Sequence, residues 1–349
     1  LPLREDDEDI LTLRLKQCIH CGYLHPLRGE DSYDLCQRCG KPLETALPQP
    51  LLKMQNVVTR RRDRINADEE ERLRLGYDLR SGVRFAEKNG RLEAQTARVL
   101  TNPDSEHLAT LTYAQTASLW RINLGWARRK QKRQFGFVLD IERGYWEKNN
   151  EEQDDPDDRM SQRTRRVIPY VEDSRNCLLF EPVESLELEA MASLQTALKR
   201  AIQTVYQLED SELAAEPLPD DQNRRLLLFY EAAEGGAGVL RRLVDEAGAL
   251  ARVAQIALEI CHFDPETGVD RGRHPNAKEL CEAACYDCLL SYGNQREHEL
   301  LDRKRIRDYL MLLSQSSVES SPVHAARSEH LERLLARCES ELERDWLVY

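Results

Sequence analysis

The chain has 349 residues, of which 41% are hydrophobic and 32% are charged, and its formal net charge is −12. This length allows two or three domains with separate cores, and the hydrophobic fraction is typical of a folded protein. The negative charge excludes a surface that attracts nucleic acid everywhere, so any contact with DNA has to be local. No run approaches the roughly 20 apolar residues of a membrane-spanning helix, and we expect no membrane partner.

Cysteine usage indicates the compartment. Of the ten cysteines, only Cys177 and Cys338 stand apart, and the others fall into two tight groups. In a large chain without a secretory signal, such grouping favours metal binding in a reducing, cytoplasmic environment over disulfides. The chain starts at Leu1 with neither a signal peptide nor an initiator methionine, and we expect it to be part of a longer polypeptide.

The first group of cysteines has the spacing of a zinc ribbon. An alternation of apolar and polar residues at 10–15 predicts a strand, and two Cys-x2-Cys pairs follow it. These four cysteines are Cys18, Cys21, Cys36 and Cys39. Four thiolates saturate tetrahedral zinc and leave no position for a catalytic water, so we predict a structural ion. His20 and His25 are alternative ligands, and four unrelated thiols are the remaining alternative.

The middle of the chain predicts a β-rich unit. Strand-like runs lie at 77–85, 92–100, 108–113 and 135–141. Lys88-Asn89-Gly90, between the first two runs, is a hairpin signal. For residues 114–126 we predict a helix, with a strand as the alternative.

The C-terminal half predicts a mixture of strands and helices. We expect a strand near 167–171, a helix at 185–208 with apolar residues at helical spacing, a buried strand at 224–230 and a helix at 239–260. A glycine turn at 235–238 joins the last two, and this strand–turn–helix unit implies an α/β core. The turn could hold a phosphate at the helix N-terminus, but tight packing is favoured because no nucleotide fingerprint surrounds it.

The second group of cysteines predicts another structural zinc site. Its members are Cys261, Cys281, Cys285 and Cys288. His262, His274 or His298 could replace one thiolate, and a metal-free buried cluster is the alternative. A set of polar residues follows, which we interpret as a network that buttresses the site. It comprises Asn294, Gln295, His298, Asp302 and Arg303.

Two segments carry a family resemblance. Residues 231–240 contain Gly-Gly-Ala-Gly, and residues 284–295 contain Cys-Tyr-Asp-Cys-Leu. Together with His298 and residues 301–303, they resemble the four-cysteine zinc-binding C-terminal domain of superfamily-2 DEAD/DEAH-box helicases. That group includes MrfA-type DNA repair helicases and the helicases of the anti-phage systems DISARM and Druantia. The resemblance covers about residues 10–310.

The resemblance implies a zinc-bearing accessory region that helps a helicase motor to hold or route DNA. ATP and magnesium would then bind only in motor domains N-terminal to residue 1 of the same polypeptide, and other defence-system subunits are candidate partners. We do not expect this fragment itself to be an enzyme. It has no G-x-x-x-x-G-K-[ST] loop, and the acidic run at 68–71 follows polar residues and not a buried strand.

Three basic clusters are candidates for phosphate contacts, at residues 60–64, 128–133 and 163–166. The second cluster lies close to Trp120 and Trp126, and charge beside aromatic rings suits phosphate neutralisation combined with base stacking. The predicted DNA-binding set is Arg121, Trp126, Arg128, Arg129, Lys130, Lys132 and Arg133. Because acidic residues lie near each cluster, ordinary solvated surface is the alternative.

These observations predict a multidomain fold of the α+β or α/β class. Its parts are a zinc ribbon at 1–50, a β-rich domain at 51–150, an α/β domain with the second zinc site at 160–315 and a helical tail at 316–349. The predicted function is a non-catalytic, DNA-engaging accessory region of an ATP-dependent helicase or translocase in bacterial anti-phage defence or DNA repair, with two structural Zn²⁺ ions.

Two other functions stay open. The chain could be a protein-interaction scaffold that docks a partner nuclease or a defence subunit. Alternatively, it could be a module attached to a nuclease, because the tail resembles the first helix of restriction-endonuclease-like domains, with Glu341 at a position that can join a metal site there.

Overall fold

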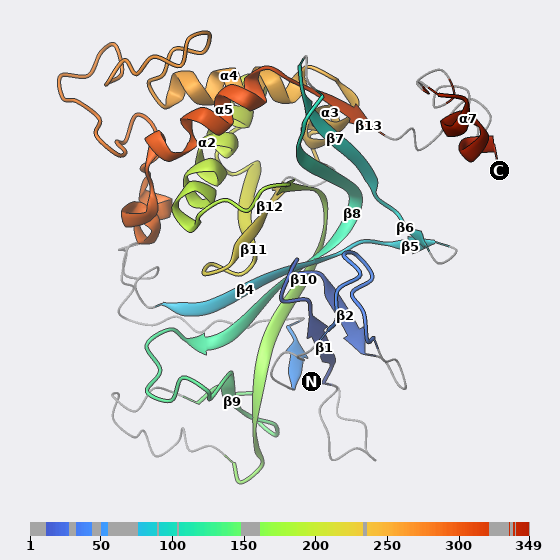
Figure 1. Cartoon of the computed structure of the whole chain (residues 1–349). Coiled ribbons are helices and arrows are strands. Elements are labelled where there is room, and N and C mark those ends of the chain that lie inside the picture. The colour runs from blue at the N-terminus through green and yellow to red at the C-terminus, as the bar shows by residue number, and fades with distance from the viewer. Residues whose placement is uncertain are drawn as a thin grey trace.

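The structure is a computed structural model that describes residues 12–27, 33–43, 50–54, 76–88, 91–102, 105–147, 161–232, 236–320, 335, 338 and 340–348. It is a mixed α+β fold in which one large sheet runs through the molecule and helices cover one end of it (Figure 1). The predicted fold class is therefore confirmed. The basic cluster at 60–64, the acidic run at 68–71 and the hairpin tip at 89–90 lie outside the described residues.

The large sheet contains nine of the described strands. Its main path is β11 (Leu213–Pro219), β12 (Arg224–Glu231), β10 (Thr164–Pro182), β8 (His107–Trp126), β7 (Gln95–Thr101) and β13 (Ser316–Ser320). Beside this path, β3 (Leu51–Lys53) and β9 (Phe137–Asp140) pair with β10, and β4 (Tyr77–Arg84) pairs with β8. Only the pairing of β3 with β10 is parallel among these strands, so the sheet is not the parallel sheet of an α/β core.

Strands β8 and β10 are the longest of the sheet, with 20 and 19 residues. Strand β8 pairs with β10 along one edge, and with β7 and then β4 along the other. The helix predicted at 114–126 is therefore wrong, because these residues form the second part of β8. Leu119 and Trp120 are adjacent and both buried, so this strand lacks the apolar–polar alternation of a strand with one solvent-exposed face. Pairing of β8 with β10 also crosses the predicted boundary near residue 150.

Helices pack over one half of this sheet. They are α2 (Leu188–Tyr206), α3 (Val239–Asp245), α4 (Ala249–Ile260) and α5 (Arg307–Ser314). Their apolar side chains form one core with β12 and β10, which includes Leu198, Phe229 and Leu258. The helix predicted at 185–208 and the buried strand at 224–230 are confirmed. The helix predicted at 239–260 divides into α3 and α4, because the chain is extended at Glu246.

The N-terminal part is a small unit packed on β4. Hairpin β1 (Arg14–Gln17) and β2 (Leu24–Leu27) brings the Cys-x2-Cys loops against the sheet. The contact is close at Gly82, where a Cβ atom would lie 2.6 Å from the Leu24 side chain. A second hairpin pairs β5 (Glu87–Lys88) with β6 (Arg91–Leu92), as the turn signal predicts.

Three short helices complete the description. They are the 3-10 helices η2 (Tyr292–Leu300) and η3 (Arg303–Ile306), and α7 (Glu341–Val348). The range predicted as a helical tail thus contains α7 but opens with strand β13, which extends the sheet beside β7. Among the helices in the described ranges, none combines the length and the apolar character needed to cross a bilayer.

Candidate metal centres and nucleic-acid surface

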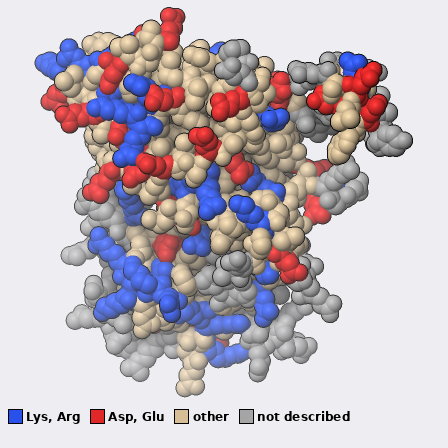
Figure 2. Space-filling model, in the orientation of Figure 1, with Lys and Arg blue, Asp and Glu red and all other residues tan. Residues whose placement is uncertain are grey.

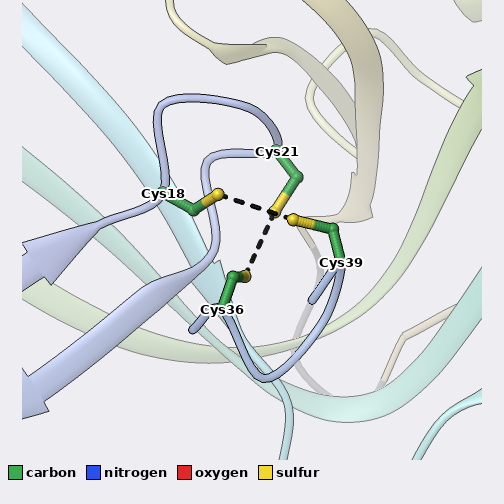
Figure 3. Close-up of side chains that lie close together, drawn as sticks. All are labelled: Cys18, Cys21, Cys36 and Cys39. Carbon is green, nitrogen blue, oxygen red and sulfur yellow. Dashed lines mark hydrogen bonds between the residues drawn. The ribbon is translucent and has the colours of Figure 1, made fainter. Parts of the chain in front are cut away.

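The structure brings the four ribbon cysteines to one point. Their sulfur atoms all lie within 4.8 Å of one another, and the pairs Cys18–Cys39 and Cys21–Cys36 are each 3.6 Å apart (Figure 3). Zinc–sulfur bonds of about 2.3 Å in a tetrahedron place the sulfurs about 3.8 Å apart, whereas a disulfide needs about 2.05 Å. The donor chemistry and the spacing therefore fit a closed, four-thiolate zinc centre.

The two cysteine loops of this centre are built alike. In the first, Gly22 N donates to Cys18 O (2.8 Å), and in the second, Gly40 N donates to Cys36 O (2.8 Å). The two glycines have φ values of +71° and +69°, a conformation that glycine adopts without strain. Each turn points both thiols of its pair to the same side. The Cys-x2-Cys-Gly sequence thus accounts for the local geometry without help from the rest of the fold.

The alternative histidine ligands lie outside this centre. Arg225 donates to His20 Nδ1 at 3.2 Å, and the backbone N–H of Gln37 donates to His25 Nε2 at 3.1 Å. Burial lowers the pKa of His25 to about 4, so this imidazole is neutral and acts as an acceptor. In addition, Arg38 of the second loop pairs with Glu181 at the end of β10, 2.6 Å away. This ion pair fastens the ribbon to the main sheet.

The second centre contains one histidine. His262, Cys281, Cys285 and Cys288 have donor atoms within 4.8 Å of one another. Cys288 Sγ lies 3.7 Å from Cys281 Sγ and 3.6 Å from Cys285 Sγ, and His262 Nε2 lies 3.2 Å from Cys285 Sγ. Three thiolates and an imidazole are a donor set of structural zinc. In the structure the fourth donor atom of this group belongs to His262, and the predicted ligand Cys261 lies outside the group.

The end of α4 explains this exchange. Cys261 continues the last turn with φ −78°, is fully buried and belongs to the apolar core. Burial raises the pKa of the Cys261 thiol to about 12, which suits a protonated core thiol. At His262 the backbone adopts the left-handed conformation, with φ +64°. The His262 side chain therefore lies with the three cysteines of the centre, and the Cys261 side chain does not. The sequence alone cannot show which of two adjacent donors this turn presents.

Arg303 supports the backbone of the second centre. The side chain is 1% exposed and forms a bidentate ion pair with Asp270, at 2.7 and 2.9 Å. It also donates to the carbonyl oxygens of Cys281 (2.7 Å) and Cys261 (3.1 Å) and lies over the Phe263 ring. One buried guanidinium thus links α4, the loop of Cys281 and η3. This agrees with the predicted buttressing role of Arg303.

Other predicted network residues brace the loop that follows Cys288. Asn294 Nδ2 donates to Leu289 O at 2.8 Å, and His298 Nε2 lies 3.0 Å from Asn294 Oδ1. Asp302 caps η3 by accepting from Lys304 N. Arg200 of α2 donates to Cys288 O, a contact that no sequence signal indicated.

The thiols of the second centre have perturbed acidities. Burial raises the pKa of both Cys281 and Cys288. Without a metal these groups therefore carry protons at neutral pH. A bound zinc ion would displace the protons, so zinc affinity should increase with pH.

Part of the predicted DNA-binding set serves the structure itself. Arg129 pairs with Asp78 at 2.8 Å, and Trp126 stacks on Tyr77 with ring centroids 4.6 Å apart. Arg121 pairs with Glu216 at 2.9 Å. These three side chains hold the end of β8 and its loop in place.

The other basic residues of the second cluster are exposed, as is Arg163 of the third cluster. They are Arg128, Lys130, Lys132 and Arg133, together with Arg163, which directly precedes β10 and has a half-exposed side chain. We call these five residues the basic surface. Arg166 donates to Gly136 O at 2.9 Å, and β9 pairs with the start of β10, so the second and third clusters lie at the same end of the molecule. Figure 2 shows Lys and Arg gathered over the lower part of this face, where β8 ends in Figure 1.

The glycine turn before α3 does not present a free helix terminus. Glu231 of β12 is buried, and its carboxylate accepts from Gly238 N (3.1 Å) and Leu240 N (3.0 Å). A carboxylate of the chain thus occupies the place that a phosphate would need. The packing interpretation of this turn agrees with these contacts.

The family comparison matches the part of the chain that contains the second centre. Residues 194–289 match the family model of the MrfA Zn-binding domain. This segment begins within α2 and includes all four donors of the second centre. The match confirms the predicted resemblance to the helicase-associated zinc-binding region of MrfA-like proteins.

A solved structure, described as a crystal structure of the DUF1998 helicase MrfA bound to DNA, is similar at a TM-score of 0.34 and 11% sequence identity. The similarity covers 67% of this chain and 25% of that chain, so this chain spans about a quarter of the length of that helicase. No curated protein matches the sequence.

Proposed function

We propose that the chain is a non-catalytic, zinc-stabilised and DNA-engaging accessory region of an ATP-dependent DNA helicase or translocase. The observation that carries this proposal is the match of residues 194–289 to the MrfA Zn-binding domain, with a complete set of one histidine and three cysteine donors inside the matched segment. The chain contributes structure and DNA contacts, and ATP hydrolysis belongs to motor domains N-terminal to it in the same polypeptide.

Two structural zinc ions are part of this proposal. Each centre offers four protein donors, so a tetrahedral ion has no open position for water or substrate. The ions therefore fasten loops and do not perform chemistry. Thiolate-rich centres persist in a reducing compartment, which supports a cytoplasmic protein.

The basic surface is the proposed contact for DNA phosphates. Arg128, Lys130 and Arg133 are exposed and have no ion pair with other described residues. Arg129 and Trp126 hold the loop that presents them, through Asp78 and Tyr77. Because the overall charge is −12, such a local surface also orients the chain on DNA.

The biological setting that we propose is bacterial anti-phage defence or DNA repair. It is supported by the family resemblance, since that group of helicases serves both processes. Other defence-system subunits are proposed partners in the first case.

DNA binding at several salt concentrations tests this function. Replacing Arg128, Lys130 and Arg133 by alanine should reduce the slope of log affinity against log salt by about 2 to 3, because each neutralised phosphate contributes about 0.7 to 0.9. A matched control replaces Arg241, Arg252 and Arg307, which carry the same charge on helices α3, α4 and α5. Equal slopes in both triple variants would remove the basic surface from the proposal. An absence of DNA binding by the unaltered chain would reject the function.

A further inference from the structure

A groove separates the sheet from the zinc-braced loop. Its volume is about 700 Å³, within the roughly 300–1,000 Å³ typical of small-ligand sites. One wall consists of β4, β8 and β11, and the other consists of α2 and η2. The η2 wall begins four residues after Cys288, and its Asn294 donates to Leu289 O, so the second centre holds this wall in place.

An aromatic side chain stands on each wall of the groove. Tyr77 on β4 is 40% exposed although it stacks on Trp126, and Tyr292 at the start of η2 is 76% exposed. Tyr292 leans on Tyr286, with ring centroids 6.0 Å apart. Exposed, braced rings of this kind offer stacking platforms for planar groups.

The charges of the groove are largely balanced. Lys199 pairs with Asp210 at 2.8 Å, and Arg121 pairs with Glu216. Glu297 pairs with Arg224, which lies behind the groove wall. The lining also includes amide side chains from α2 and η2, namely Gln195, Gln203, Asn294 and Gln295. Balanced charges and exposed aromatic rings suit the faces of bases better than they suit phosphates.

The groove adjoins the basic surface. Tyr77 lines the groove and stacks on Trp126, which lies two residues before Arg128. A strand whose phosphates follow the basic surface would therefore reach the groove at Tyr77. In a duplex the base faces are stacked and hidden, so only an unpaired strand can use both features.

We propose that this groove receives the bases of single-stranded DNA, which stack on Tyr77 and Tyr292 while the phosphates lie on the basic surface. The inference rests on the proposed function and specifies its ligand as an unpaired strand. The second zinc centre then has a defined purpose, because it holds the η2 wall of the groove in place.

Binding of labelled oligothymidine, an abasic oligonucleotide of the same length and a duplex tests this inference. The unaltered chain should prefer oligothymidine to the other two. Tyr292→Ala should weaken oligothymidine binding roughly 5- to 100-fold, as expected for a lost stacking contact, without changing the salt slope. Tyr292→Phe should keep the affinity, and Tyr77→Ala should bind more weakly than Tyr77→Phe. The salt slope is compared in the Tyr292 variants, because Tyr77 also supports Trp126. Leu280→Ala is the control, because Leu280 is 74% exposed and does not line the groove.

Each outcome decides between the two proposals. Equal affinities for oligothymidine and the abasic strand, or unchanged affinity in both tyrosine-to-alanine variants, would overturn the groove. If the basic-surface variant still loses salt dependence in that case, the proposed function stands without it. Tighter binding of the duplex than of oligothymidine would also overturn the groove. Circular dichroism and zinc content identical to those of the unaltered chain show that each variant is folded.

Discussion

Replacing Arg303 by methionine would test how the second metal centre is supported. Methionine keeps much of the apolar stem but removes the ion pair to Asp270 and the donors to Cys261 O and Cys281 O. Removing one member of a buried ion pair costs about 3–5 kcal/mol. Since Asp270 is 35% exposed and water can reach it, we expect the lower end, about 3 kcal/mol.

A loss of that size should lower the unfolding temperature by roughly 5–10 °C. It should also speed the release of one zinc equivalent to a colorimetric chelator, because the backbone on both sides of Cys281 loses its support. Arg305→Met is the matched control. Arg305 lies two residues later and is 45% exposed, so its pairing with Glu187 should contribute less than about 1 kcal/mol. If both variants unfold within about 2 °C of the unaltered chain, the buttressing argument is refuted.

Two further predictions concern single groups. His262→Ala should lower the zinc content by one equivalent per chain in elemental analysis, whereas Cys261→Ala should keep it, and the opposite result would restore Cys261 as the ligand. Asp140 is buried, which would raise its pKa, but hydrogen bonds from Ser161 and from the backbone N–H groups of Glu142 and Arg143 lower the pKa to about 2. Its stabilising effect is therefore present above the unfolded pKa of about 3.9 and disappears as the pH falls toward 2. Urea unfolding between these values should show a steeper loss of stability for the unaltered chain than for Asp140→Asn, and parallel curves would contradict the assignment.

Structural features that depend on neighbouring residues could be predicted from the sequence. The two Cys-x2-Cys-Gly loops contain their own hydrogen-bond pattern, so spacing alone led to the first centre. Helix α2 and strand β12 were also predictable, because each has one clear periodicity or a continuous apolar run. In these cases neighbouring residues determine the structure.

Long-range pairing explains what the sequence did not show. The second part of β8 is a strand because β10 and β4 occupy its two edges, and the sequence of 114–126 does not reveal those partners. Likewise, the sequence does not reveal that Arg129 pairs with Asp78, 51 residues away. The contact of Arg200 with Cys288 spans 88 residues and has no local signal either.

The continuity of β8 and β10 limits how this protein can be divided. Cys177 and Leu179 of β10 pair with one portion of β8, and Tyr170 and Val171 pair with another portion of the same strand. A cut between these portions would leave two fragments, each with an open sheet edge and half of an apolar interior. Shortened versions for crystallography or interaction mapping should therefore keep both strands whole, because the zinc ribbon and the helices both pack on the sheet that these strands form.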